Sequence, residues 1–279
     1  MAARSVMQPW LHSQLLVLGC WGFVMLTGLA GCAANSALGD FGAPRQDIST
    51  PSEESEARRR ARIRLELAVN YFDQGQTNIA LDEVRQSLAT DPNFAEAYNL
   101  RGLIYMRLND ARTAEDDFRR ALAITPADGN ILHNYAWLMC QERRYADAET
   151  YFGRALSIPT YTERAKTLMG QGLCKARSGQ RAEAELVLLR SYELDPANPV
   201  TGFNIALLMF QRGEFTRAQF YIRRLNNSDY ANAGSLWLGI RVERKMGDKV
   251  AMQQLVDQLR KRFPQSKELA AYEKGSFDE

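Results

Sequence analysis

The chain has 279 residues, of which 46% are hydrophobic and 24% charged, and its formal net charge is +2. This is the composition of a globular protein, and the nearly neutral balance excludes a nucleic-acid partner attracted by bulk charge. Nine prolines and the scarcity of alternating β-branched residues argue against a β fold. The two histidines, His12 and His133, are too few for a histidine-based metal centre, and the spacing of the four cysteines fits no zinc or redox motif. We therefore expect no metal site.

An apolar, uncharged segment occupies residues 15–30 and leads into Leu29-Ala30-Gly31-Cys32. A short apolar core that closes on small residues is typical of a secretory signal peptide. The four closing residues resemble the lipobox of bacterial lipoproteins, in which the cysteine receives a diacylglycerol and becomes the mature N-terminus. An uncleaved membrane anchor and an ordinary secreted protein are the alternatives, although the apolar run is slightly short for a spanning helix. We expect a lipoprotein signal peptide over residues 1–31, with Met1 or Met7 as the start.

Cys32 is thus the predicted lipidation site, and we expect no cofactor other than this covalent lipid. More than one acyl chain suffices for stable anchoring to a membrane. The residue after the cysteine is Ala33 and not an aspartate. By resemblance to Gram-negative lipoproteins, this favours sorting to the outer membrane, with the protein facing the periplasm. Residues 33–50 consist of Ala, Ser, Gly, Pro and polar residues, so 32–50 is a predicted flexible tether.

Beyond the tether, the sequence repeats with a period of about 34 residues. The clearest copy is 95–128, with its diagnostic residues at Tyr98, Gly102, Tyr105, Ala114, Phe118, Ala121 and Pro126. This is the tetratricopeptide pattern, a helical hairpin whose small residues let two helices cross closely and whose proline ends the second helix. The register predicts hairpins at 61–94, 95–128, 129–164, 165–198, 199–231 and 232–263, with two extra residues around 158–163. The predicted fold is all-α: a right-handed superhelical solenoid of six repeats over 51–264, closed by a C-terminal capping helix in 265–279.

The basic run Arg58–Arg64 is predicted to be a solvated helix face rather than a lipid-binding patch. No catalytic set emerges, so we expect no enzyme. His133 and Cys140 share one helix face, but about 10 Å of helical rise separates them, which is beyond hydrogen-bond reach. Cys140 and Cys174 fall on the first helices of adjacent repeats. The periplasm would permit a disulfide between them. We favour two buried thiols, because cysteine is among the most buried residue types.

Positions 5, 9 and 12 of each first helix are expected to face the concave groove of the solenoid, and most of them are apolar. A continuous apolar groove indicates a partner that inserts an amphipathic helix or an extended peptide. The alternative for any one residue is packing within or between repeats. Chaperone-binding repeats clamp a peptide carboxylate with a set of Lys, Arg and Asn residues, and this set is missing from these positions, where Asn99 alone is of these types. The predicted partner-binding residues are Leu65, Val69, Phe72, Leu103, Met106, Trp137, Leu173, Phe203, Leu207 and Phe210.

Three segments beyond the repeat consensus resemble the PilF/PilW family of type IV pilus biogenesis lipoproteins, also called secretin pilotins. ILHNYAWL at Ile131–Leu138, followed by RYADA at Arg144–Ala148, is similar to the family's LNNYG and KRYEEA. YTER at Tyr161–Arg164, in the two-residue insertion, is similar to YPER, and NAGSLWLGIR at Asn232–Arg241 is similar to NARSLLLGIR. The lipobox and the six repeats agree, so the resemblance covers essentially the whole mature chain.

The resemblance implies a non-enzymatic outer-membrane lipoprotein that binds the type IV pilus secretin subunit. Such proteins promote the localisation of the secretin to the outer membrane and its multimerisation, and thereby support pilus biogenesis. The chain would contact the membrane through its lipid anchor and would bind no nucleic acid, and we expect a monomer. A tetratricopeptide scaffold lipoprotein of another outer-membrane or cell-wall assembly complex is the alternative.

Overall fold

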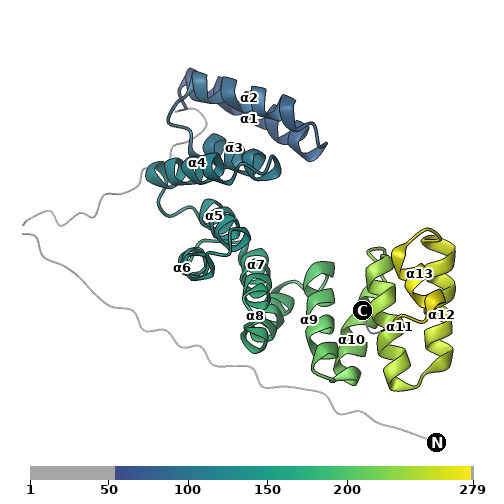
Figure 1. Ribbon diagram of the computed structural model, residues 1–279. Coiled ribbons are helices and arrows are strands. Elements are labelled where there is room, and N and C mark those ends of the chain that lie inside the picture. The colour runs from purple at the N-terminus through teal and green to yellow at the C-terminus, as the bar shows by residue number, and fades with distance from the viewer. Residues whose placement is uncertain (1–53, 278–279) are drawn as a thin grey trace, which may run out of the picture. The chain divides into compact units, whose positions relative to one another are not determined.

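The computed structural model describes residues 54–277, and within this range it contains thirteen α-helices and no strand (Figure 1). The predicted signal peptide, Cys32 and the tether lie outside the described residues. The helices are α1 (Glu56–Asp73), α2 (Thr77–Thr90), α3 (Ala95–Arg107), α4 (Ala111–Ile124), α5 (Gly129–Gln141), α6 (Tyr145–Leu156), α7 (Arg164–Arg177), α8 (Arg181–Leu194), α9 (Pro199–Gln211), α10 (Phe215–Asn226), α11 (Ala233–Met246), α12 (Lys249–Arg262) and α13 (Lys267–Lys274).

Consecutive helices pair into six hairpins, from α1–α2 to α11–α12, and α13 packs on α11 and α12. The first helix of each hairpin also contacts the first helix of the next, so that α1, α3, α5, α7, α9 and α11 adjoin in turn. This is the arrangement of a tetratricopeptide solenoid, and the predicted fold class is confirmed (Figure 1). It places the first helices side by side on one surface, which is where the predicted groove residues stand.

Tight turns with a residue in the left-handed region connect the two helices of a hairpin. Glycine occupies this position in the first hairpin, at Gly75 with φ of 76°. The third hairpin uses Arg143 instead, at φ of 59°. A non-glycine residue costs about 1–3 kcal/mol in such a conformation, which the packing of the surrounding hairpin has to offset.

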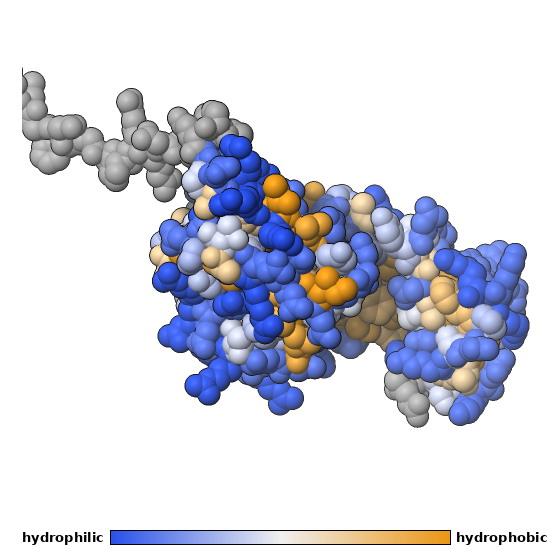
Figure 2. Space-filling model, turned by 90° about the horizontal axis from the view of Figure 1, so that it is seen from above, coloured by the Kyte–Doolittle hydropathy of each residue, from blue (hydrophilic) through white to orange (hydrophobic). Residues whose placement is uncertain are grey.

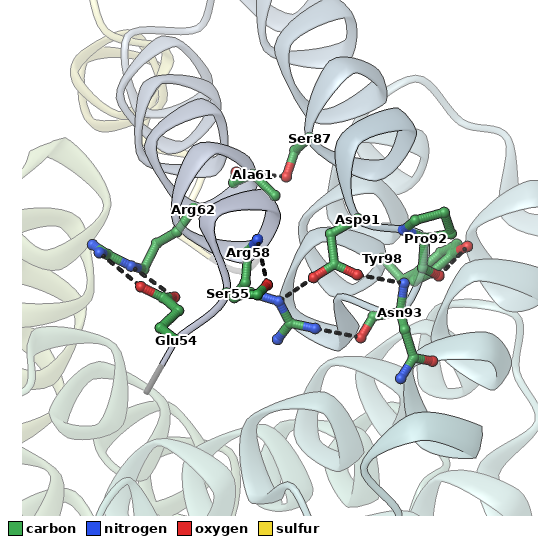
Figure 3. A network of polar contacts seen from close by, with 10 residues as sticks. All are labelled: Glu54, Ser55, Arg58, Ala61, Arg62, Ser87, Asp91, Pro92, Asn93 and Tyr98. Carbon is green, nitrogen blue, oxygen red and sulfur yellow. Dashed lines mark hydrogen bonds and ion pairs between the residues drawn. The ribbon is translucent and has the colours of Figure 1, made fainter. Parts of the chain in front are cut away.

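The N-terminal hairpin is fixed to the next one by the basic run of α1 (Figure 3). The guanidinium of Arg58 pairs with Asp91, donates to the carbonyl of Asn93 at 2.8 Å and lies 4.4 Å from the centroid of the Phe94 ring. Arg58, as a hydrogen-bond donor, lowers the pKa of the Asp91 carboxyl below its usual value. Arg62 likewise pairs with Glu54 at 3.2 Å. Arg58 and Arg62 are therefore paired with carboxylates of the same chain.

Small residues set the distance between the two helices of each hairpin. A Cβ built on Gly102 would lie 2.8 Å from the ring of Phe118, and one built on Gly172 would lie 2.6 Å from Cγ of Leu188. Both partners are fully buried in the second helix of the same hairpin. Interiors packed this closely cannot accept an extra methyl group without a shift of side chains or backbone.

A disulfide joins Cys140 on α5 to Cys174 on α7, whose Cα atoms lie 5.7 Å apart. The preference for two buried thiols is therefore wrong. Both residues are nearly inaccessible, as that interpretation required. Their sulfur atoms are nevertheless bonded, because α5 and α7 bring the two cysteines together in spite of the two-residue insertion between α6 and α7. The bond links the first helices of the third and fourth repeats, next to the two-residue insertion in the repeat register.

Replacement of Gly172 by alanine tests the close crossing. We expect Gly172→Ala to lower the free energy of unfolding by about 1–3 kcal/mol, because Leu188 and the carbonyl of Ala184 must move. The matched control is Gly153→Ala in α6, where no atom lies within 4 Å of the added Cβ. This change should be neutral or stabilise by up to about 1 kcal/mol through helix propensity. Urea denaturation followed by circular dichroism measures both, and equal effects at the two sites would contradict the packing argument.

Removal of the disulfide tests its contribution to stability. The two cysteines are 34 residues apart in sequence, and closing a loop of this length contributes about 4 kcal/mol in the chain-entropy model. We expect a reductant, or the double replacement C140A/C174A, to lower the melting temperature measured by circular dichroism. The double variant should then be insensitive to reductant. A reductant-sensitive melting temperature in the double variant would contradict the assignment.

Candidate functional site

The ten predicted partner-binding residues all stand on the surface formed by α1, α3, α5, α7 and α9, which we call, together with α11, the first-helix surface. Nine of them are half-buried, and Val69 is 40% exposed. Most of them pack at the edges of the buried clusters: Leu65 and Phe72 beside Ala68, and Leu103, Met106 and Trp137 beside Met139. Phe203, Leu207 and Phe210 do the same farther along the chain. Each of these side chains thus combines repeat packing with an accessible portion. Partner binding by that portion stays a prediction.

Apolar side chains also reach the outer surface in strips bordered by hydrophilic ones, as the face drawn in Figure 2 shows. At the fifth repeat the first-helix surface is hollowed. A cavity of about 400 Å³ there is lined by Val200, Phe203, Leu225 and Tyr230, among others. Phe203 therefore stands at the wall of a space that a side chain of a partner can enter.

Three other positions of the predicted groove serve the interior instead. His133 is 7% exposed, and its Nδ1 lies 3.1 Å from Oγ1 of Thr167, which in turn lies 2.8 Å from the hydroxyl of Tyr161. Desolvation, assisted by the charge of Lys166, lowers the pKa of His133 to about 4, so the imidazole is neutral at pH 7. Cys140 is held in the disulfide. A Cys–His nucleophile dyad is therefore not formed.

The third interior position is Glu243, which is fully buried. It accepts from Nε of Arg223 at 2.7 Å and from Gln219 at 2.7 Å. The two other buried carboxylates, Asp117 and Glu185, are likewise paired with Arg101 and Arg212, each at 2.6 Å. A buried charge is tolerated when it is paired in this way.

Sequence reasoning missed three arginines on the first-helix surface. Arg107 of α3 lies over the ring of Phe72 at 3.6 Å from its centroid, Arg177 of α7 over Trp137 at 4.7 Å, and Arg241 of α11 over Phe210 at 4.8 Å. We call Arg107, Arg177 and Arg241 the stacked arginines. In each case the arginine belongs to one repeat and the aromatic residue to the repeat before it. Cation–π contacts of this kind contribute about 0.5–1 kcal/mol at exposed sites.

The stacked arginines correct the view that the groove lacks basic residues. Positions 5, 9 and 12 do lack them, but Arg107 and Arg177 both stand at position 13 of their repeats, one residue farther along. Their recurrence at that position was visible in the sequence. What was not visible is that the side chain bends back over a ring of the preceding repeat.

No helix in residues 54–277 is both long enough and apolar enough to cross a membrane. In the same part of the chain, no group of three or more His, Cys, Asp or Glu residues is placed to hold a metal ion. The first-helix surface, with its aromatic residues and arginines, is accordingly the candidate site that the described residues offer.

Comparison with known proteins matches residues 65–129 to the tetratricopeptide repeat family model. The type IV pilus assembly protein PilF of Pseudomonas aeruginosa is 25% identical over 251 residues, which cover 90% of this chain and 96% of that protein. The crystal structure of PilW, a widely conserved type IV pilus biogenesis factor, is 29% identical with a TM-score of 0.69 and covers 76% of this chain and 97% of that one.

A solved structure of Pseudomonas aeruginosa PilF has a TM-score of 0.71 at 24% identity and covers 79% of this chain and all of that one. At this identity it supports the fold alone. The matches extend over most of both chains, and they agree with the three segments that suggested the resemblance. The chain folds as a tetratricopeptide solenoid and is similar, over most of its length, to the type IV pilus proteins PilF and PilW.

Proposed function

We propose that this protein acts in type IV pilus biogenesis as a lipid-anchored binding protein of the outer membrane, with the secretin subunit as its partner. The observation that carries the proposal is the similarity to PilF over 90% of this chain and to PilW over 76% of it, in agreement with the resemblance of the YTER and NAGSLWLGIR segments to that family. The structure explains why those segments matter to the fold. Tyr161 of the insertion packs on Gly129 and bonds to Thr167, and Asn232 forms a capping box with Ser235 at the start of α11.

The first-helix surface is the part of the molecule that would hold the partner. Its half-buried aliphatic and aromatic side chains provide apolar contact area for a partner, while their other portions stay packed in the repeats. Before assembly, a segment of a membrane-channel subunit would expose apolar residues to water, and such a surface shields them. A lipid at Cys32 with a tether over 32–50 would keep this surface close to the membrane. Tethering raises the effective concentration of the bound subunit there, so a modest affinity suffices.

Site-specific cross-linking in cells identifies the partner. A photoreactive amino acid at Phe203, in the wall of the cavity, or at Leu207 should capture the secretin subunit. The matched control is the same amino acid at Phe220 of α10, which is 62% exposed but stands on a second helix. Adducts with β-barrel assembly subunits or cell-wall proteins, and none with the secretin, would contradict the proposal and favour the alternative scaffold role.

Loss of apolar contact on α3 should impair the function. We expect L103S/M106S to reduce secretin multimers in outer-membrane fractions and surface pili by about tenfold, since two half-buried side chains of the surface lose most of their apolar area. L186S/F220S removes apolar side chains that are 61% and 62% exposed on second helices and should leave both readouts unchanged. Melting temperatures and protein abundance separate loss of binding from loss of folding. Normal multimers in cells that lack the protein altogether would refute the proposed function.

The predicted lipid attachment has its own test. Cys32→Ser should abolish labelling of the protein by a palmitate analogue and move it from the outer-membrane to the soluble fraction. Cys20→Ser, twelve residues earlier in the apolar segment, should leave labelling unchanged. Labelling that persists in Cys32→Ser would show that the lipidation site lies elsewhere.

A further inference from the structure

We propose that the partner segment held by the first-helix surface is acidic as well as apolar, and that its carboxylates pair with the stacked arginines Arg107, Arg177 and Arg241. This inference rests on the binding role proposed above and adds the chemistry of the bound segment. It differs from a purely apolar groove, because it predicts that the charge of the partner decides binding.

The geometry of the three arginines is the first support. Each guanidinium carbon lies within 5 Å of the centroid of an aromatic ring, with Phe72, Trp137 and Phe210 as the rings. A guanidinium that lies against a ring can still donate from its N–H groups to a carboxylate. Arg107 is fixed further, since its Nη1 donates to the carbonyl of Phe72 at 2.6 Å. The arginines are thus oriented before a ligand arrives.

The charge balance of the chain is the second support. In residues 54–277, Asp117, Glu185 and Glu243 are buried carboxylates, and each is paired with an arginine. Lys175, the residue after Cys174 on α7, is paired with Glu149 at 3.3 Å. None of the stacked arginines has a carboxylate within 4 Å among the same residues, and Nε of Arg241 is buried without a hydrogen-bond partner. The stacked arginines are therefore basic groups without an acid partner on the surface that also carries the accessible aromatic residues.

Their spacing is the third support. The arginines belong to the second, fourth and sixth hairpins, and the rings beneath them to the first, third and fifth. Adjacent packed helices lie about 8–10 Å apart, so successive arginines are separated by roughly 16–20 Å, or two helix spacings. A helical partner covers that distance in about 11–13 residues. A segment of about 25 residues with acids near both ends and the middle can therefore engage all three.

Two synthetic peptides test the charge preference. Both have 28 residues and the same leucine stripe at helical spacing, and they differ only in having glutamate or lysine on the polar face. Fluorescence anisotropy measures their binding to the full chain in nanodiscs of zwitterionic lipid, with empty nanodiscs as the blank. We expect the glutamate peptide to bind at least about tenfold more tightly than the lysine peptide, and the difference to shrink as salt rises, because exposed ion pairs are screened.

Variants assign the preference to the stacked arginines. R107Q/R177Q/R241Q should weaken binding of the glutamate peptide by about tenfold or more, and R107E/R177E/R241E should reverse the preference toward the lysine peptide. The matched control is R119Q/R181Q/R190Q, which removes three exposed arginines of the second helices α4 and α8. The reversal is a readout that a merely structural role would not produce. Equal binding of the two peptides to the parent chain, or an unchanged preference in the glutamate variant, would overturn the proposal.

These experiments distinguish a failure of the acidic-partner proposal from a failure of the proposed pilus function. Capture of the secretin by cross-linking without any charge preference would refute the acidic character and leave the pilus function standing. A charge preference with capture of another assembly protein would support the acidic character and refute the secretin as partner.

Discussion

The whole molecule depends on the close crossing of two helices within each hairpin. Gly102 and Gly172 let the ring of Phe118 and the side chain of Leu188 lie against the backbone of the first helix. That contact buries one face of the hairpin and leaves another apolar face uncovered, which only the next hairpin can cover. Stacking follows, and with it the alignment of α1, α3, α5, α7, α9 and α11 on one surface. The candidate site is thus a by-product of the packing that makes the repeat stable.

The junction between the third and fourth repeats shows how an irregularity is accommodated. The insertion adds residues between α6 and α7, and Tyr161 from this segment fills the space beside Gly129. Its hydroxyl is hydrogen-bonded to Thr167, and Thr167 is hydrogen-bonded to the neutral His133, so these buried polar groups satisfy one another. The disulfide between Cys140 and Cys174 fastens the same two first helices. Two of the three segments that resemble the PilF/PilW family meet at this junction.

The sequence contained most of the fold and part of the candidate site. The period of Ala, Gly, aromatic and Pro residues sets the register of the six hairpins, because these residues act within one hairpin and their spacing is local. Contacts between hairpins were harder to foresee. His133 and Glu243 occupy positions that face the groove in the repeat pattern, yet both are buried in bonds to other helices. Arg107 and Arg177 recur at one repeat position, but only the structure shows that their side chains lie over Phe72 and Trp137.

The disulfide has a mechanical consequence. In a linear array each repeat touches only its neighbours, so tension between the two ends of the chain passes through every junction in series, and the array opens first at its weakest one. The covalent bond between α5 and α7 carries the tension across the junction that contains the insertion, so this junction is no longer one of those that can open. Under tension the residues between Cys140 and Cys174, which include α6 and the insertion, would carry no load, and the repeats on either side would yield before them. An oxidising compartment would therefore determine not only the stability of the array but also the order in which its repeats come apart.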